Sequence, residues 1–164
     1  MAQLSAFVLS ALNAQANHEF QNQQAYLSLA SWANFSGLTG CANWLAGQSR
    51  DEGKHAALVI EYIEDRNEMY VPAPITSPLP LPGTVVEAFQ RVYEVETGTT
   101  QTIQDLLRLA FDSNDQMTCA FLAKSLILEQ IEEEKKAQTC LDRLAACGAD
   151  GAALAAFDVW VGSL

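Results

Sequence analysis

The first helix that the sequence predicts carries polar residues in the middle of an otherwise apolar face. From about Ser5 to Phe35 the chain has no proline or glycine, and most of its residues favour or tolerate helix. Positions that step alternately by four and three lie on one face of such a helix. Because a buried carboxylate without a partner is costly, Glu19 indicates either a partner inside the protein or a face open to water. The face comprises Val8, Leu12, Gln15, Glu19, Asn22, Tyr26, Leu29 and Ala33.

A second helix with the same layout is expected from about Cys41 to Glu68. We expect Thr39, at the end of the glycine-containing break before it, to be its N-cap. Glu52 and His55 are three positions apart in the middle of the apolar face, so they stack on one side of the helix. A carboxylate and an imidazole at this spacing can bind one metal ion together, although Glu-x-x-His also occurs by chance in many helices. The face comprises Cys41, Leu45, Gln48, Glu52, His55, Val59 and Tyr62.

All five prolines fall between Met69 and Gly83, so this segment cannot be helical throughout. About 15 extended residues reach ~45 Å, which is also the length of a helix of ~30 residues. The segment can therefore run the length of a bundle and start the third helix at the same end as the second. This predicts an all-α fold, a four-helix bundle with a long crossover between helices two and three. We expect residues 1–164 to form a single domain.

The third helix is expected over about Thr84–Asp112, with Glu96 in the middle of its apolar face. The pattern again alternates steps of three and four, with apolar residues before and after the carboxylate. Gly98 weakens this helix locally without ending it. The face comprises Val85, Phe89, Val92, Glu96, Thr99, Ile103, Leu106 and Ala110.

The fourth helix is expected to begin after Ser113-Asn114-Asp115 and to run to about Cys147, where Gly148 ends it. Residues 129–134 place four carboxylates within six positions, and two lysines follow, as in a solvated acidic run. The apolar face nevertheless predicts that Glu129 and Glu133 point inward. The face comprises Leu122, Leu126, Glu129, Glu133, Lys136, Cys140 and Leu144.

The amino-acid composition narrows the range of possible functions. The chain has 164 residues, 49% of them hydrophobic, which suffices for one core, and its net charge of −11 argues against binding nucleic acid or an anionic membrane surface. An acidic surface suits a protein that handles cations, although it more often only aids solubility. No C-x-x-C pair occurs, and residues 1–15 carry no signal-peptide signature, so we expect a reducing, cytoplasmic location and no membrane span. The four cysteines are Cys41, Cys119, Cys140 and Cys147.

All four helices thus place an ionisable group near the middle of an apolar face. Like charges that close cannot coexist unless protons or cations neutralise them. Several carboxylates with one histidine suit two bridged iron or manganese ions better than zinc or copper, and the core of a bundle is where such sites are built. The groups are Glu19, Glu52 with His55, Glu96, and Glu129 with Glu133.

These motifs resemble those of the non-haem ferritins over nearly the whole chain. The resemblance rests on Glu19 with Tyr26, on Glu52-x-x-His55, on Glu96 and on Glu129-Gln130-x-Glu132-Glu133, together with the crossover and a short apolar tail that implies a fifth helix. It implies shells of 24 subunits that oxidise Fe(II) with O2 or H2O2 and store a ferric mineral.

The resemblance also implies roles for individual residues. Glu19, Glu52 and His55 would hold a first iron. Glu52 would bridge to a second iron held by Glu96 and Glu133. Further implied are Gln130 beside the second iron, Tyr26 beside the pair, and a third iron site of Asp51, Glu129 and Glu132.

Departures from related families sharpen the expectation. Bacterioferritins carry a second Glu-x-x-His on the fourth helix, which this chain lacks. They also bind haem through a methionine where this chain has Gly53, so we expect no haem. In animal ferritins two acidic residues line the three-fold pore, and the matching positions here are Ala120 and Ala123. We therefore expect this pore to be a poor iron path.

Two other function classes stay open at this point. A diiron redox enzyme acting on a small substrate would need an open pocket beside the metals. A purely structural acidic bundle would bind no iron. Iron loading separates the three hypotheses, since only a storage protein retains far more iron than its metal sites can hold.

Overall fold

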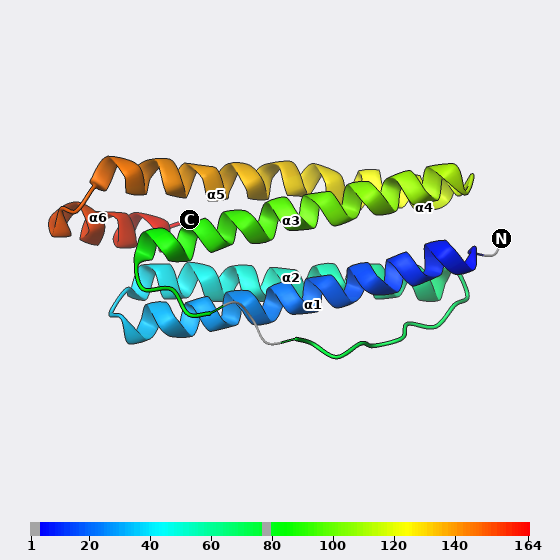
Figure 1. The fold of residues 1–164 in the computed structure, drawn as a ribbon, viewed down its shortest axis with the longest axis horizontal. Coiled ribbons are helices and arrows are strands. Elements are labelled where there is room, and N and C mark those ends of the chain that lie inside the picture. Colours follow the sequence, from blue (N-terminus) through cyan, green and yellow to red (C-terminus); the bar gives the residue numbers. More distant parts are fainter. Residues whose placement is uncertain (1–3, 77–79) are drawn as a thin grey trace.

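Two antiparallel helix pairs make up the body of the molecule (Figure 1). The structure is a computed structural model that describes residues 4–76 and 80–164, and over these residues it contains helices and no strand. Helix α1 (Ala6–Phe35) packs mainly against α2 (Thr39–Asp65). Helix α3 (Val85–Asp112) packs mainly against the run from Gln116 to Cys147. The expected four-helix bundle is confirmed.

The long crossover between α2 and α3 is also confirmed. It runs beside α1 along the length of the bundle, so that α3 starts at the end where α2 started (Figure 1). Two asparagines of α1 hold it there. The Asn17 Oδ1 accepts hydrogen bonds from the Tyr70 hydroxyl at 2.7 Å and from the Ala73 amide at 2.9 Å. The Asn13 Oδ1 accepts one from the Val71 amide at 2.6 Å, so side chains satisfy backbone groups that the proline-rich segment cannot pair itself. Pro78 lies outside the described residues.

The core is divided into two apolar clusters with a polar layer between them. One cluster, near the α6 end, contains Leu29, Leu45 and Phe89, and the other, at the opposite end, contains Leu12, Val59 and Ile103. Each cluster draws residues from several helices, as the faces read from the sequence require. None of the described helices has the length and apolar character needed to cross a membrane.

The fourth long helix is not a regular α-helix. It comprises α4 (Gln116–Leu122), a π-helix η1 (Ala123–Ile127) and α5 (Leu128–Cys147). A π-turn fits one extra residue into the helix, so the positions just after it are displaced relative to the α-helical pattern, whereas Cys140 and Leu144 further along are buried as expected. The prediction that Glu129 lies on the apolar face is therefore wrong: its side chain is 49% exposed, and Gln130 is buried in its place. Lys136 is likewise exposed, whereas Glu133 is half-buried.

A short helix α6 (Gly151–Val161), capped by Asp150, folds back onto α2 and α5. The fifth helix expected from the resemblance is thus confirmed. Its Asp158 carboxylate accepts hydrogen bonds from the Gly40 amide at 3.1 Å and the Cys41 amide at 2.8 Å. The prediction of Thr39 as N-cap is wrong, because no side chain at the N-cap position, Leu38, caps α2 and Asp158 supplies the acceptor instead. A Cβ on Gly40 would lie 1.9 Å from the Asp158 backbone oxygen, so only glycine fits this contact.

Replacing Asp158 with alanine should therefore destabilise the subunit. The change leaves two amides of the first turn of α2 without an acceptor, which typically costs about 1 kcal/mol. Urea unfolding followed by circular dichroism should show a lower free energy of unfolding. Asp142→Ala is the matched control, since the Asp142 carboxylate accepts a hydrogen bond from the nearby Gln138 on the exposed face of α5. Equal stabilities of the two variants would contradict the capping role of Asp158.

Candidate metal centre

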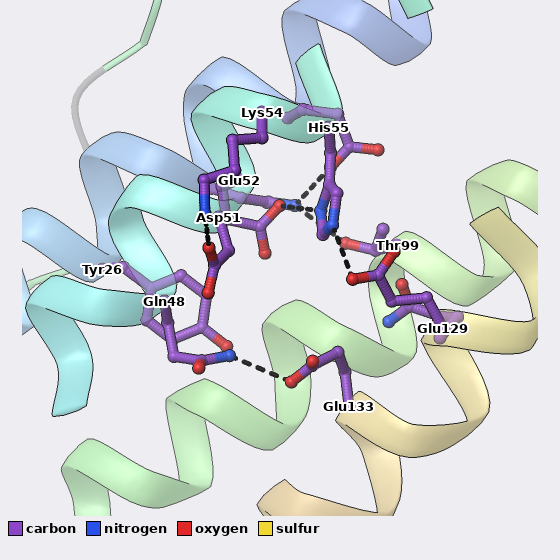
Figure 2. Close-up of polar contacts among 12 residues, drawn as sticks. Tyr26, Gln48, Asp51, Glu52, Lys54, His55, Thr99, Glu129 and Glu133 are labelled. Atoms are coloured by element: carbon purple, nitrogen blue, oxygen red, sulfur yellow. Dashed lines mark hydrogen bonds and ion pairs between the residues drawn. The ribbon is translucent and has the colours of Figure 1, made fainter. Parts of the chain in front are cut away.

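The polar layer between the two apolar clusters contains one tight group of metal-binding side chains. Glu19 comes from α1, and Glu52 and His55 come from α2. One ligand atom of each residue lies within 4.8 Å of the ligand atoms of the other two. Among the described residues, these three form the candidate metal-binding group. The Nδ1 of His55 is 3.4 Å from the Glu52 carboxylate (Figure 2). The structure thus brings together three of the six ionisable residues that the sequence placed at mid-helix.

Neutral amides position Glu19 within the bundle. The Gln15 Nε2 donates to its Oε1 at 2.6 Å, and the Asn22 Nδ2 lies 3.4 Å from its Oε2. The Asn22 amide also donates to the Thr99 hydroxyl of α3 at 2.8 Å, which in turn lies 3.1 Å from the His18 Nε2. Glu19 is therefore held by a network that reaches from α1 to α3.

Burial dominates the electrostatics of this group. It raises the pKa of Glu19 to about 8, and the negative charge of Glu52 adds to the effect. Burial also raises the pKa of Glu52. For His55, burial opposes the charged form but is outweighed by the Glu52 contact and by the charges of Glu129 and Glu19, which raise its pKa to about 9. Without a metal, the group therefore retains protons that a cation would replace.

A third buried carboxylate of the polar layer, Glu96, comes from α3. The buried Tyr26 hydroxyl donates to Glu96 Oε1. The Gln130 Nε2 donates to its Oε2 at 2.8 Å and to its backbone oxygen at 2.9 Å. Burial raises the pKa of Glu96, and burial followed by the charges of Glu96 and Glu52 raises that of Tyr26 well above its ordinary value. Tyr26, Glu96 and Gln130 are thus joined in one hydrogen-bond network.

Glu133 is engaged elsewhere. Its Oε2 accepts a hydrogen bond from the Gln48 Nε2 at 3.0 Å, and its Oε1 lies 2.6 Å from the Lys136 Nζ (Figure 2 shows the first contact). Burial lowers the pKa of Lys136, but the Glu133 contact and the charges of Glu133, Glu132 and Glu129 outweigh it and raise the pKa overall. Glu133 thus approaches the polar layer without joining the tight group.

The three residues expected to form a third metal site are not gathered into one group. Asp51 pairs with Lys54 at 2.6 Å. The Glu129 carboxylate lies 3.3 Å from the His55 Nε2, and Glu132 is exposed. Glu129 is therefore the one of the three that touches the tight group.

Sequence reasoning assigned no role to four residues that the structure places around the carboxylates. Three of them, Gln15, Asn22 and Gln48, are polar residues on the apolar faces within one turn of Glu19 or Glu52. That position was the available signal, because an amide on a buried face needs a partner. The fourth, Lys136, was assigned to an inward-facing position and instead reaches Glu133 from the exposed side.

The donor set fits a hard divalent cation. Carboxylate oxygens with a single imidazole, and with no cysteine among them, favour iron or manganese over zinc or copper. Glu52 lies between Glu19 and His55 on one side and contributes to the electrostatics of Tyr26, the partner of Glu96, on the other.

Comparisons with known proteins agree with this geometry. Residues 9–147 match the ferritin family, described as a ferritin-like domain. A bacterial non-heme ferritin of Staphylococcus epidermidis is 32% identical over 147 residues, which are 90% of this chain and 88% of that protein. A probable bacterial non-heme ferritin-like protein of Haemophilus influenzae is 30% identical over 161 residues, 98% of this chain and 97% of that protein.

A solved structure gives the same result for the fold. An open pore ferritin from the hyperthermophilic archaeon Archaeoglobus fulgidus superposes with a TM-score of 0.96 and 31% identity, covering 99% of this chain and 98% of that chain. Family match, sequence identity and fold therefore lead to one assignment, which confirms the resemblance seen in the sequence. The chain belongs to the ferritin family, and its relatives include the bacterial non-haem ferritins.

Proposed function

We propose that the protein oxidises Fe(II) at a diiron site inside each subunit, with O2 or H2O2 as oxidant, and stores ferric mineral inside a hollow shell of 24 copies. The observation that carries the proposal is the buried group of Glu19, Glu52 and His55, whose ligand atoms lie within 4.8 Å of one another. The similarity to bacterial non-heme ferritins supports storage as the purpose of that chemistry.

Glu19, Glu52 and His55 would bind the first Fe(II). Glu52 would bridge to a second Fe(II) held by Glu96 and Glu133, with Gln130 fixing Glu96. Two Fe(II) supply the two electrons that reduce O2, with two protons, to hydrogen peroxide. The carboxylates release their own protons as the cations bind, and as hard oxygen donors they stabilise Fe(III).

The remaining expectations stay proposals. Asp51, Glu129 and Glu132 would form a third iron site, and the protein would act in the cytoplasm without haem or nucleic acid. Ala120 and Ala123 are exposed on α4 and at the start of η1. That they make the three-fold pore a poor iron path stays a proposal as well.

The alternative function is a diiron enzyme that acts on a small substrate, and such a substrate would need a pocket near the metals. A groove of about 520 Å³ between α3 and α5 is lined by Gln130 but by none of the proposed metal ligands. A substrate in it would be separated from the metals by the Gln130 side chain. A storage protein and a diiron enzyme differ in whether the oxidised iron stays with the protein.

Glu52→Ala should abolish the rapid phase of Fe(II) oxidation, because it removes the proposed bridge, and should leave the bundle folded since it relieves repulsion among buried carboxylates. Stopped-flow absorbance after mixing with aerobic Fe(II) measures the phase. Glu61→Ala, an exposed change on the same helix, should oxidise iron like the wild type.

Wild-type kinetics in Glu52→Ala would contradict the diiron assignment. Iron uptake then tests storage. After repeated aerobic additions and gel filtration, the wild type should retain far more iron than its metal sites can hold. Retention no greater than those sites can hold would favour the enzyme alternative, and no retention would favour a structural bundle.

The metal-free protein should lose stability as the pH rises from about 5 to 9. Glu19 has a pKa of about 8 when folded against an ordinary value of 4.5, and His55 has about 9 against 6.5. Both groups thus bind protons more tightly in the folded state than in the unfolded state. Their contribution to the free energy of unfolding is complete when the pH is below the unfolded-state pKa. It is lost as the pH rises through the folded-state pKa. Glu19 alone would contribute a slope of up to about 1.4 kcal/mol per pH unit.

Urea unfolding of chelator-treated protein at several pH values measures this slope. Glu19→Gln keeps the shape of the side chain and removes its titration, so the variant should show a shallower decline between pH 5 and 8. A slope identical to that of the wild type would show that Glu19 does not carry a raised pKa.

Tyr26→Phe should leave metal binding intact and change how the oxidised centre decays. The variant removes only the hydroxyl that donates to Glu96, while the buried ring keeps its packing. If the phenol supplies an electron, rapid-freeze electron paramagnetic resonance should detect a radical in the wild type and in Tyr93→Phe but not in Tyr26→Phe. The same radical signal in all three proteins would remove Tyr26 from the mechanism.

A further inference from the structure

Among the described carboxylates proposed to hold the two irons, Glu133 is the one that pairs with a lysine ammonium. Gln48 of α2 donates to Oε2 at 3.0 Å, as Figure 2 shows, and the Lys136 ammonium lies 2.6 Å from Oε1. The contacts come from two different helices, and the Glu133 side chain is only 13% exposed. Its orientation is therefore determined from both sides.

The Lys136 contact competes directly with a metal. An ammonium and an Fe(II) ion that share one carboxylate repel each other, and a like charge within about 4–6 Å shifts an ionic equilibrium by one to three powers of ten. In the other half of the site, the side chains that hold Glu19 are the neutral amides of Gln15 and Asn22. Glu19 and Glu133 thus differ in the charge of their hydrogen-bond partners.

Lys136 also has a place to go when a cation arrives. Its side chain is 47% exposed, and it lines a cavity of about 430 Å³ together with Gln48 and Asp51. A displaced ammonium would stay in contact with water and would not be forced into the apolar core. The competition can therefore be resolved by a movement of one side chain.

We propose that Lys136 is a positioning residue that, with Gln48, holds Glu133 turned away from the metal group and is displaced when the second Fe(II) binds. The inference rests on the proposed function. It means that the Lys136 ammonium weakens the binding of the ion beside Glu96 and Glu133.

Zn(II), which does not change oxidation state, is the probe. Crystals of the wild type, Lys136→Met and Lys136→Arg are soaked over a series of Zn(II) concentrations, and anomalous diffraction gives the occupancy at each position. Methionine has a similar length and no charge, and arginine restores the charge. Lys135→Met is the matched control, because it removes the same charge from the neighbouring, exposed position.

In Lys136→Met, the ion beside Glu96 and Glu133 should reach half occupancy at about tenfold lower Zn(II) than in the wild type. The ion at Glu19, Glu52 and His55 should be unaffected. Lys136→Arg and Lys135→Met should both behave like the wild type, and Glu133 should point toward Glu96 when the ion is present.

Three outcomes would overturn the inference. They are equal occupancy curves in Lys136→Met and the wild type, an equal gain in Lys135→Met, and no ion beside Glu133 in either protein. An empty position at Glu19, Glu52 and His55 would instead contradict the proposed function, whatever the difference at Glu133.

Discussion

The burial of like charges in the middle of the bundle is the constraint on which the rest of the structure depends. Glu19, Glu52 and Glu96 are each almost completely buried, yet carboxylates are tolerated there only when protons, cations or hydrogen-bond donors compensate them. The apolar clusters at both ends supply the stability that this layer costs. Neutral amides from three helices then fix the carboxylates without neutralising their charge. That charge is left for a bound cation to neutralise.

The two halves of the site meet this constraint in different ways. The half with Glu19, Glu52 and His55 is assembled before any metal is present. The other half is divided, because Glu96 is bound to Tyr26 and Gln130 whereas Glu133 is bound to Gln48 and Lys136. Assembling it requires exchanging existing contacts for metal contacts.

Local pattern was enough to predict the helices, the crossover and three residues of the site, because periodicity and proline content act within a few residues. It failed where a distant or irregular feature intervened. The cap of α2 comes from Asp158, far along the chain, so Thr39 was chosen on local preference alone. The π-turn in η1 displaced the face by one residue and exposed Glu129. The pairing of Glu133 with Gln48 depends on how α2 and α5 pack, which no single helix pattern contains.

The contact between Asp158 and the start of α2 has a consequence for biosynthesis. Asp158 lies 118 positions after Gly40, so a ribosome that has made α1 and α2 has not yet made the acceptor for the first amides of α2. Until then, the N-terminal end of the helix that carries Glu52 and His55 can fray into water. Folding of a nascent chain generally starts from the N-terminal side, but this site can be completed only late. The first turn of α2 is therefore capped only after almost the whole chain has been made.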